Sequence, residues 1–284
     1  MTALEAIILG AIQGLTEFIP ISSSAHLLII RWVFGWEAKG VAFDAVIHLG
    51  TLLALLLFFG QDWYSVGRAC LATTRFARRK APVIAVASTS AVPAMLLWPI
   101  VLACIPAGLI GFLFDDVIEG KFRNAPVLTG VLLIAMGIVL YLADRMGRKS
   151  RPMHAVRTRD WLFIGIAQAL AVIPGVSRSG ITISAGLMSG LEREAAARFS
   201  FLVGAPVIFG AGIWELHKVM KAGLTGADAM PLILGVVAST IVGYACIKFL
   251  IEYLRKRSTA LFVVYRVALG VGVIAAYMMG HLKV

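Results

Sequence analysis

Two short polar segments interrupt an apolar chain, and both contain residue types that could do chemistry. The first runs from Gln13 to His26 and the second from Gln168 to Gly180. Polar and charged side chains cost free energy in hydrocarbon, so they mark functional sites within apolar segments. When the first segment is displaced by 155 positions, identical residues coincide at Gly10 and Gly165, Gln13 and Gln168, Leu15 and Leu170, Ser22 and Ser177, and Ser24 and Ser179. The two segments are therefore the candidate active site, built from an internal repeat.

The first segment offers a carboxylate, three hydroxyls and an imidazole. Glu17 could act as a general base, as an orienting acceptor or as a metal ligand. The hydroxyls of Ser22, Ser23 and Ser24 either cap a helix that begins there or bind an anion beside its N-terminus. His26 could activate a hydroxyl or attack phosphorus itself.

The second segment offers a guanidinium between hydroxyls and a glycine. Ser177, Arg178, Ser179 and Gly180 follow one another. Arginine suits phosphate because its planar fork of donors binds two oxygens at once. An arginine that only pairs with a carboxylate such as Glu17 is the alternative, but it would not explain the surrounding hydroxyls. A phosphate or diphosphate is therefore the favoured class of ligand.

The composition places both segments in a membrane protein. The chain has 284 residues, of which 60% are hydrophobic and 14% are charged, and its mean hydropathy is +0.91. A soluble domain carries about a quarter charged residues. The net charge of +11 comes largely from basic groups at 68–80, 145–159 and 255–257. Because each group lies in a short connection between apolar runs, it is typical of cytoplasmic loops rather than of nucleic-acid binding.

The apolar runs predict six transmembrane helices. They cover roughly 42–60, 84–113, 125–144, 199–217, 230–251 and 260–280, which suits the ~20 residues that cross a bilayer. When the basic connections are placed in the cytoplasm, 1–36 and 160–191 become segments that enter and leave the membrane on one side. Proline and glycine at their centres predict that a helix breaks there.

We therefore expect an all-α polytopic membrane protein with a single membrane domain over 1–284. Its halves, about 1–144 and 160–284, each contain one re-entrant helical hairpin and three transmembrane helices. The basic stretch 145–159 is the cytoplasmic connection between them. Because the halves have opposite orientation, they form an inverted-topology repeat whose broken segments meet near the midplane.

Several other polar residues and glycines are expected to have structural roles. His48 is expected to be a core histidine with satisfied hydrogen bonds, and Asp44 a cap or an interface acid. Arg266 is expected to extend from near a helix end towards the headgroups. Close helix packing, rather than ligand binding, is expected of Gly10, Gly14, Gly165 and Gly186.

The two polar motifs carry a resemblance to a known family. The sequence QGLTEFIPISSSAH, from Gln13 to His26, and PGVSRSG, from Pro174 to Gly180, resemble the two signature regions of the undecaprenyl-diphosphate phosphatase family. These are bacterial membrane enzymes associated with bacitracin resistance, and the resemblance spans nearly the whole chain. It implies hydrolysis of a polyprenyl diphosphate to the monophosphate and inorganic phosphate. This reaction recycles the lipid carrier of cell-wall peptidoglycan synthesis at the outer face of the bacterial plasma membrane.

The resemblance also implies roles for individual residues and for a metal. The implied catalytic residues are Glu17, Ser23, His26 and Arg178. Gln13 stands where some members have a glutamate, so Glu17 acts alone or with a substrate-bound metal. A divalent cation, Mg²⁺ or Ca²⁺, is implied and is expected to be held by the substrate, with Glu17 as the one protein ligand considered. Substrate-binding positions are expected at Gln13, Ser22, Ser24, Ser177, Ser179 and Gly180.

The mechanism expected from both arguments keeps the prenyl tail in lipid while the diphosphate enters from the outer leaflet. Ser23, activated by His26 or Glu17, attacks the terminal phosphorus, or His26 is itself the nucleophile. A transporter or flippase of the polyprenyl phosphate carrier is the alternative, because inverted repeats with broken helices also occur in transporters. The expected partners are the polyprenyl diphosphate lipid and the bilayer, with no nucleic acid; a homodimer is left open.

Overall fold

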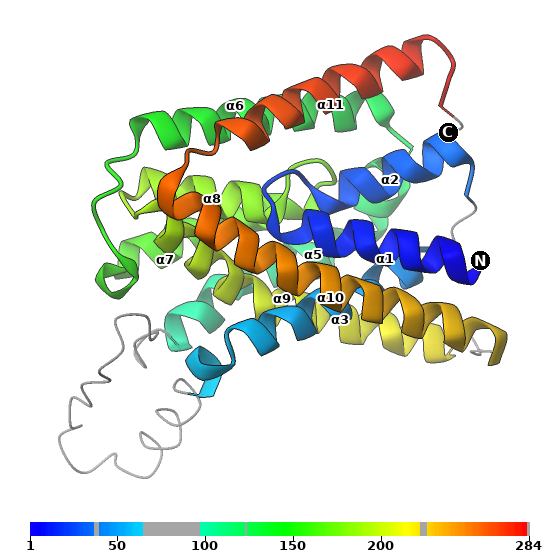
Figure 1. Cartoon of the computed structure of the whole chain (residues 1–284), viewed down its shortest axis with the longest axis horizontal. Helices are drawn as coiled ribbons and strands as arrows, with labels where there is room; N and C mark the ends of the chain where they lie inside the picture. Colours follow the sequence, from blue (N-terminus) through cyan, green and yellow to red (C-terminus); the bar gives the residue numbers. More distant parts are fainter. Residues whose placement is uncertain (37–39, 65–96, 123, 222–225, 283–284) are drawn as a thin grey trace.

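The computed structural model describes residues 1–36, 40–64, 97–122, 124–221 and 226–282, and these residues are helical with short connections (Figure 1). The basic group at 68–80 and the first part of the predicted span 84–113 lie outside the described residues. The elements are α1 (Ala3–Phe18), α2 (Ser23–Phe34), α3 (Gly40–Phe58), α5 (Leu97–Phe122), α6 (Pro126–Met146), η2 (Met153–Ala155), α7 (Thr158–Ala169), η3 (Leu170–Val172), α8 (Arg178–Met188), α9 (Arg193–Lys221), α10 (Gly226–Lys256) and α11 (Ala260–Met278).

Four helices in the described ranges are long and apolar enough to cross a membrane. They are Pro126–Met146, Arg193–Lys218, Ala229–Lys256 and Ala260–Met278. They confirm the predicted spans at 125–144, 199–217, 230–251 and 260–280. The other two predicted spans coincide with α3 and with the described part of α5, where the apolar helical stretches are shorter. The architecture is therefore that of an all-α polytopic membrane protein.

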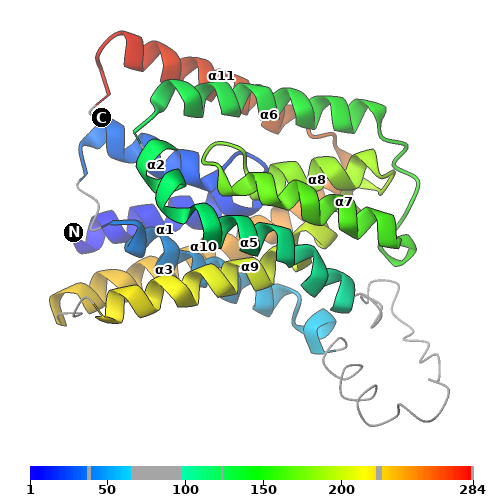
Figure 2. The ribbon, with the colours of Figure 1, turned by 180° about the vertical axis from the view of Figure 1, so that it is seen from behind.

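Both polar segments form helical hairpins whose turns meet in the middle of the molecule. One hairpin consists of α1 and α2, and the other of α7, η3 and α8. Figures 1 and 2 show the two hairpins entering from opposite ends, with their turns side by side. The hydroxyl of Ser179 in the second hairpin donates to the carbonyl oxygen of Ile19 in the first, at 3.2 Å.

The two turns share an unusual backbone geometry at equivalent positions. Helix α1 ends at Phe18, just before Pro20, because the residue before a proline disfavours helical backbone. Ser22 has φ 75° and Ser177 has φ 74°, in the left-handed region that non-glycine residues rarely adopt. Each serine immediately precedes the second helix of its hairpin. The local conformation thus repeats at the spacing seen in the sequence.

Glycines let the first helix of each hairpin approach a helix from the other half of the chain. A Cβ on Gly10 would lie 2.2 Å from the carbonyl oxygen of Gly235 in α10. A Cβ on Gly165 would lie 2.7 Å from the carbonyl oxygen of Ala103 in α5. A Cβ on Gly14 would lie 2.6 Å from the carbonyl oxygen of Ser239 in α10, and one on Gly186 of α8 would lie 2.9 Å from the Cβ of Ala196 in α9. The packing role predicted for these four glycines is confirmed.

Ion pairs gather the second and third basic connections at one end of the molecule. Asp144, at the end of α6, accepts from Arg193 at 2.7 Å and from the backbone nitrogen of Thr259 at 2.9 Å. Arg255 at the end of α10 pairs with Glu194 at 2.7 Å. Helices α6, α9, α10 and α11 are thereby joined at the end where the basic stretches lie.

Candidate active site

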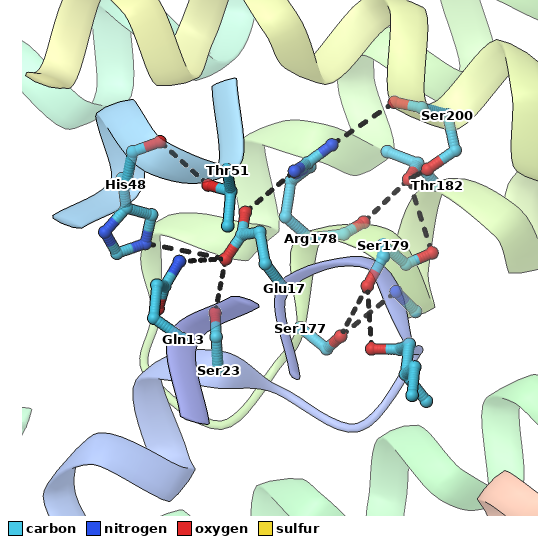
Figure 3. A network of polar contacts seen from close by, with 12 residues as sticks. Gln13, Glu17, Ser23, His48, Thr51, Ser177, Arg178, Ser179, Thr182 and Ser200 are labelled. Carbon is cyan, nitrogen blue, oxygen red and sulfur yellow. Dashed lines mark hydrogen bonds and ion pairs between the residues drawn. The ribbon is translucent and has the colours of Figure 1, made fainter. Parts of the chain in front are cut away.

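The carboxylate of Glu17 is the centre of the site (Figure 3). Its Oε1 accepts a hydrogen bond from Nη2 of Arg178, at 2.8 Å, which joins the two hairpins directly. Its Oε2 accepts from the hydroxyl of Ser23 at 2.6 Å and from the amide nitrogen of Gln13 at 2.9 Å. Glu17 is only 6% exposed. The neighbouring Phe18 anchors this end of α1 by packing edge-on against Phe201 of α9, with ring centroids 5.2 Å apart.

Helix α9 forms the surface against which Arg178 rests. The Nη1 of Arg178 donates to the carbonyl oxygen of Ser200 at 3.3 Å. The hydroxyl of Thr182, one turn after Arg178, lies 2.6 Å from the hydroxyl of Ser200. A Cβ on Gly204 would lie 1.6 Å from Nη1, so only glycine leaves room for the guanidinium there. These α9 contacts were not predicted from the sequence, although Thr182 lies one turn after Arg178 on the same helix face, which was a usable signal.

The predicted serines surround the two helix starts but differ in their hydrogen bonds. Ser177 caps α8, because its hydroxyl accepts from the backbone nitrogen of Gly180 at 3.1 Å. The hydroxyl of Ser22 makes no such bond to α2 and lies 3.3 Å from that of Ser24. Ser177 and Ser179 form the matching pair, also at 3.3 Å. The first turn of α2 is therefore the helix start whose backbone N–H groups lack a side-chain cap, and such groups bind anions.

His26 lies beside these serines, and no hydrogen bond joins it to Ser23 in the described structure. Its Nδ1 lies 2.7 Å from the carbonyl oxygen of Ser22, and a carbonyl can only accept, so this nitrogen carries a hydrogen. Its Nε2 lies 2.8 Å from the hydroxyl of Tyr265, and the two rings are stacked. Both ring nitrogens are thus engaged away from Ser23. Of the two activating groups considered for Ser23, the structure brings only Glu17 into contact with it.

His48 of α3 was expected in the core, but the structure places it beside Glu17. Its Nε2 lies 3.5 Å from Oε2 of Glu17, and the side chain is 27% exposed. Its Nδ1 lies 2.5 Å from the carbonyl oxygen of Asp44. The carboxylate of Asp44 pairs with Arg31 of α2. No local spacing links His48 to the polar segments, so only the packing of α3 could reveal it.

The prediction that Arg266 extends to the headgroups is wrong. Its side chain is fully buried in α11, with 0% exposure. Its guanidinium donates only to backbone carbonyl oxygens, and these belong to α6 and to both hairpin turns. The turns expose more carbonyl groups than their own helices can satisfy, and a buried guanidinium supplies the missing donors.

The described side chains do not fit a protein-held divalent cation. Among them, no three His, Cys, Asp or Glu residues are grouped closely enough to hold a metal ion. Both oxygens of Glu17 already accept from Arg178, Ser23 and Gln13. A hard cation needs several free oxygen ligands, which this arrangement does not offer.

The arrangement has the parts needed for phosphoryl transfer inside a membrane domain. A hydroxyl donates to a carboxylate, a guanidinium lies next to that carboxylate, and an uncapped helix start lies beside the hydroxyl. The fold and site therefore define a polytopic membrane protein with a buried candidate site for a phosphate group.

Comparisons with known proteins identify the family. A family model described as "Bacitracin resistance protein BacA" matches residues 6–272, and the chain belongs to this family. It is 45% identical over 274 residues to an undecaprenyl-diphosphatase from Desulforudis audaxviator, covering 96% of this chain and 97% of the relative. It is 44% identical over 276 residues to one from Thermomicrobium roseum, covering 95% and 96%. It is 42% identical over 283 residues to one from Trichlorobacter lovleyi, covering 100% of both.

Proposed function

We propose that this protein hydrolyses undecaprenyl diphosphate to undecaprenyl phosphate and inorganic phosphate. The observation that carries the proposal is the position of Ser23, whose hydroxyl lies 2.6 Å from Glu17 while Arg178 holds the other carboxylate oxygen. A carrier of phosphorylated lipid needs a phosphate-binding cation but has no use for a hydroxyl paired with a base. The undecaprenyl-diphosphatase names of its relatives agree with this assignment.

In the proposed reaction Ser23 is the nucleophile and Glu17 is its base. The serine oxygen bonds to the terminal phosphorus, the bridging oxygen leaves with the lipid monophosphate, and Glu17 takes the serine proton. Arg178 and the uncapped N–H groups at the start of α2 stabilise the charge on the transferring phosphoryl group. Water then attacks the phosphoserine and releases phosphate.

His26 is proposed to contact the lipid monophosphate as it leaves. Tyr265 and the carbonyl oxygen of Ser22 hold its ring in place. In the alternative mechanism His26 is the nucleophile, and its ring must first break its contacts with Tyr265 and with the carbonyl oxygen of Ser22. Ser23 requires no such movement, because its hydrogen bond already points at the base.

The inverted-topology repeat, with two re-entrant hairpins and three spans in each half, also remains a proposal. It is supported by the equal φ values at Ser22 and Ser177 and by reciprocal packing. Helix α1 of the first hairpin packs against α10 of the second half, and α7 of the second hairpin packs against α5 of the first half. With the joined basic connections in the cytoplasm, the first hairpin would open to the extracytoplasmic side of a bacterial plasma membrane.

A divalent cation, Mg²⁺ or Ca²⁺, is proposed to arrive on the diphosphate rather than on the protein. The described side chains offer no group of metal ligands, whereas the phosphate oxygens supply several hard donors. The proposal is tested by titrating activity against the cation at fixed lipid. A cation requirement that follows the lipid concentration supports it, and tight binding to the lipid-free protein contradicts it.

The decisive experiment measures phosphate release from a polyprenyl diphosphate by the purified protein in detergent. Glu17→Ala and Arg178→Ala should each abolish release. The matched controls are Glu192→Ala and Arg159→Ala, whose side chains are exposed and distant from the site, and both should retain wild-type rates. If the wild type binds the lipid but releases no phosphate, the hydrolase assignment is overturned and the transporter is favoured.

A homodimer is tested separately, by light scattering on the same preparation.

A further inference from the structure

His48 meets the catalytic carboxylate from a helix that belongs to neither hairpin. In Figure 3 its ring faces Glu17 from α3, on the side opposite Arg178. The Nε2 of His48, Ser23 and Gln13 all lie around the same oxygen, Oε2 of Glu17. This is the oxygen that must take the serine proton, so Nε2 of His48 lies next to the atom that accepts the proton.

The hydrogen bonds of His48 fix which nitrogen can accept a proton. Its Nδ1 must carry a hydrogen, because it faces the carbonyl oxygen of Asp44. The neutral ring therefore has its lone pair on Nε2, towards Glu17. The 3.5 Å separation from Oε2 of Glu17 exceeds the 2.7–3.2 Å usual for an N–H···O hydrogen bond, so the two atoms are neighbours without a direct hydrogen bond.

Gln13 cannot accept a proton from Glu17, whereas His48 can. Its amide nitrogen donates to Oε2 of Glu17, and an amide has no group that takes up a proton near neutral pH. Its buried Oε1 has no hydrogen-bond partner in the described structure. Glu17 therefore has two neighbours with different roles. Gln13 donates a hydrogen bond to its carboxylate, and the imidazole of His48 can accept a proton from it.

We propose that His48 is the proton-accepting partner of Glu17, a positioning residue that acts on Ser23 through that carboxylate. The inference rests on the proposed hydrolysis through Ser23. As the bond from Ser23 to phosphorus forms and the bridging bond breaks, the serine proton passes to Glu17 and on to Nε2 of His48. When water opens the phosphoserine, both protons of the water stay on the released phosphate. The proton on His48 then returns to the serine oxygen through Glu17.

The surrounding charges favour this role. Glu17 of α1 and Arg178 of α8 neutralise each other, and Asp44 of α3 is neutralised by Arg31 of α2. In the described residues, His48 forms no ion pair or hydrogen bond with a charged side chain of α9 or α10. Each of the two pairs carries no net charge, so neither opposes the arrival of a proton on Nε2 of His48.

The test compares two variants of the full-length protein, His48→Gln and the control His217→Gln. His217 is an exposed residue on α9. His48→Gln should lower kcat about 100-fold, within the range of general acid–base effects, and change KM less than about 3-fold. Because protonated His48 cannot accept a proton, the kcat of the wild type should fall at acid pH. The pH profile of the variant should lack this decrease. His217→Gln should match the wild type. An unchanged kcat and pH profile in His48→Gln would overturn the proposal.

Rescue by a second acceptor separates proton transfer from a merely structural role. Adding Gln13→Glu to His48→Gln places a carboxylate on the same oxygen of Glu17, and kcat should recover to within about 10-fold of wild type. No recovery in a folded double variant that binds lipid contradicts the proposal. His48→Asn, whose amide can still donate to Asp44, should lose as much activity as His48→Gln. The proposed function fails separately, if the wild type and His217→Gln release no phosphate.

Discussion

Arg266 reaches the carbonyl oxygen of Pro20, 246 positions earlier in the chain, with Nη1 at 3.1 Å. Its Nη2 donates to Gly175 at 2.9 Å and to Val176 at 3.2 Å in the other turn. Its Nε donates to Leu133 of α6 at 3.1 Å. One buried guanidinium therefore ties the two hairpin turns to each other and to α6. We therefore expect the register between Glu17 and Arg178 to depend on these hydrogen bonds.

Replacing Arg266 should destabilise the whole site. Arg266→Met leaves several buried carbonyl groups without donors, and each costs about 1–3 kcal/mol. We expect at least about 3 kcal/mol loss of stability and loss of activity, measured by thermal unfolding and phosphate release in detergent. Arg266→Lys should retain part of both. Lys248→Met, at an exposed position on α10, is the control and should unfold like the wild type. Wild-type stability in Arg266→Met would contradict the role given to the tie.

Gly204→Ala should impair catalysis more than folding. The added Cβ would lie 1.6 Å from Nη1 of Arg178, so the guanidinium must move away from Ser200 and Glu17. We expect kcat/KM to fall about 100-fold, since small displacements at a reacting centre have effects of this size. Gly210→Ala on the same helix meets nothing within 4 Å and should be active. Equal activity of the two variants would show that the position of Arg178 is unimportant.

Ser23→Ala should abolish phosphoryl-enzyme formation. Rapid quenching with substrate labelled at the terminal phosphate, followed by peptide mapping, should place the label on Ser23 in the wild type and nowhere in the variant. His26→Ala should still form labelled enzyme, more slowly. Label on His26 would reverse the roles, and label on neither residue would exclude covalent catalysis.

The glycine contacts predict matched effects in the two hairpins. Gly10→Ala should push α1 away from α10, and Gly165→Ala should push α7 away from α5. Each should lower the free energy of unfolding by about 1–3 kcal/mol, the usual range for overpacking. Gly272→Ala on α11 meets nothing within 4 Å, so its stability should be unchanged or slightly higher. Melting curves of the three purified variants check this prediction. Equal stability at all three positions would refute the packing role.

Much of the site could be predicted from local patterns in the sequence. The spacing of Gln13, Glu17 and the serines predicted one polar turn, and the Ser177–Gly180 motif predicted a second. Proline and glycine at the breaks predicted helical hairpins, because these residues end helices wherever they occur. The four clear spans followed from length and hydropathy.

The remaining features depend on which helix faces meet. In a membrane domain, lipid-facing and protein-facing sides are both apolar, so the hydrophobic pattern does not say which face of α3 meets α1. His48, Tyr265 and Gly204 were therefore invisible as site residues. Arg266 was misjudged for the same reason, since a long basic side chain near a helix end usually reaches water. The sequence by itself determined the candidate site residues in the two hairpin turns, the turns themselves and the membrane class. Only the tertiary structure decided that Glu17 takes Arg178 and His48 as neighbours, because those contacts join α1 to helices that do not follow it directly in the chain.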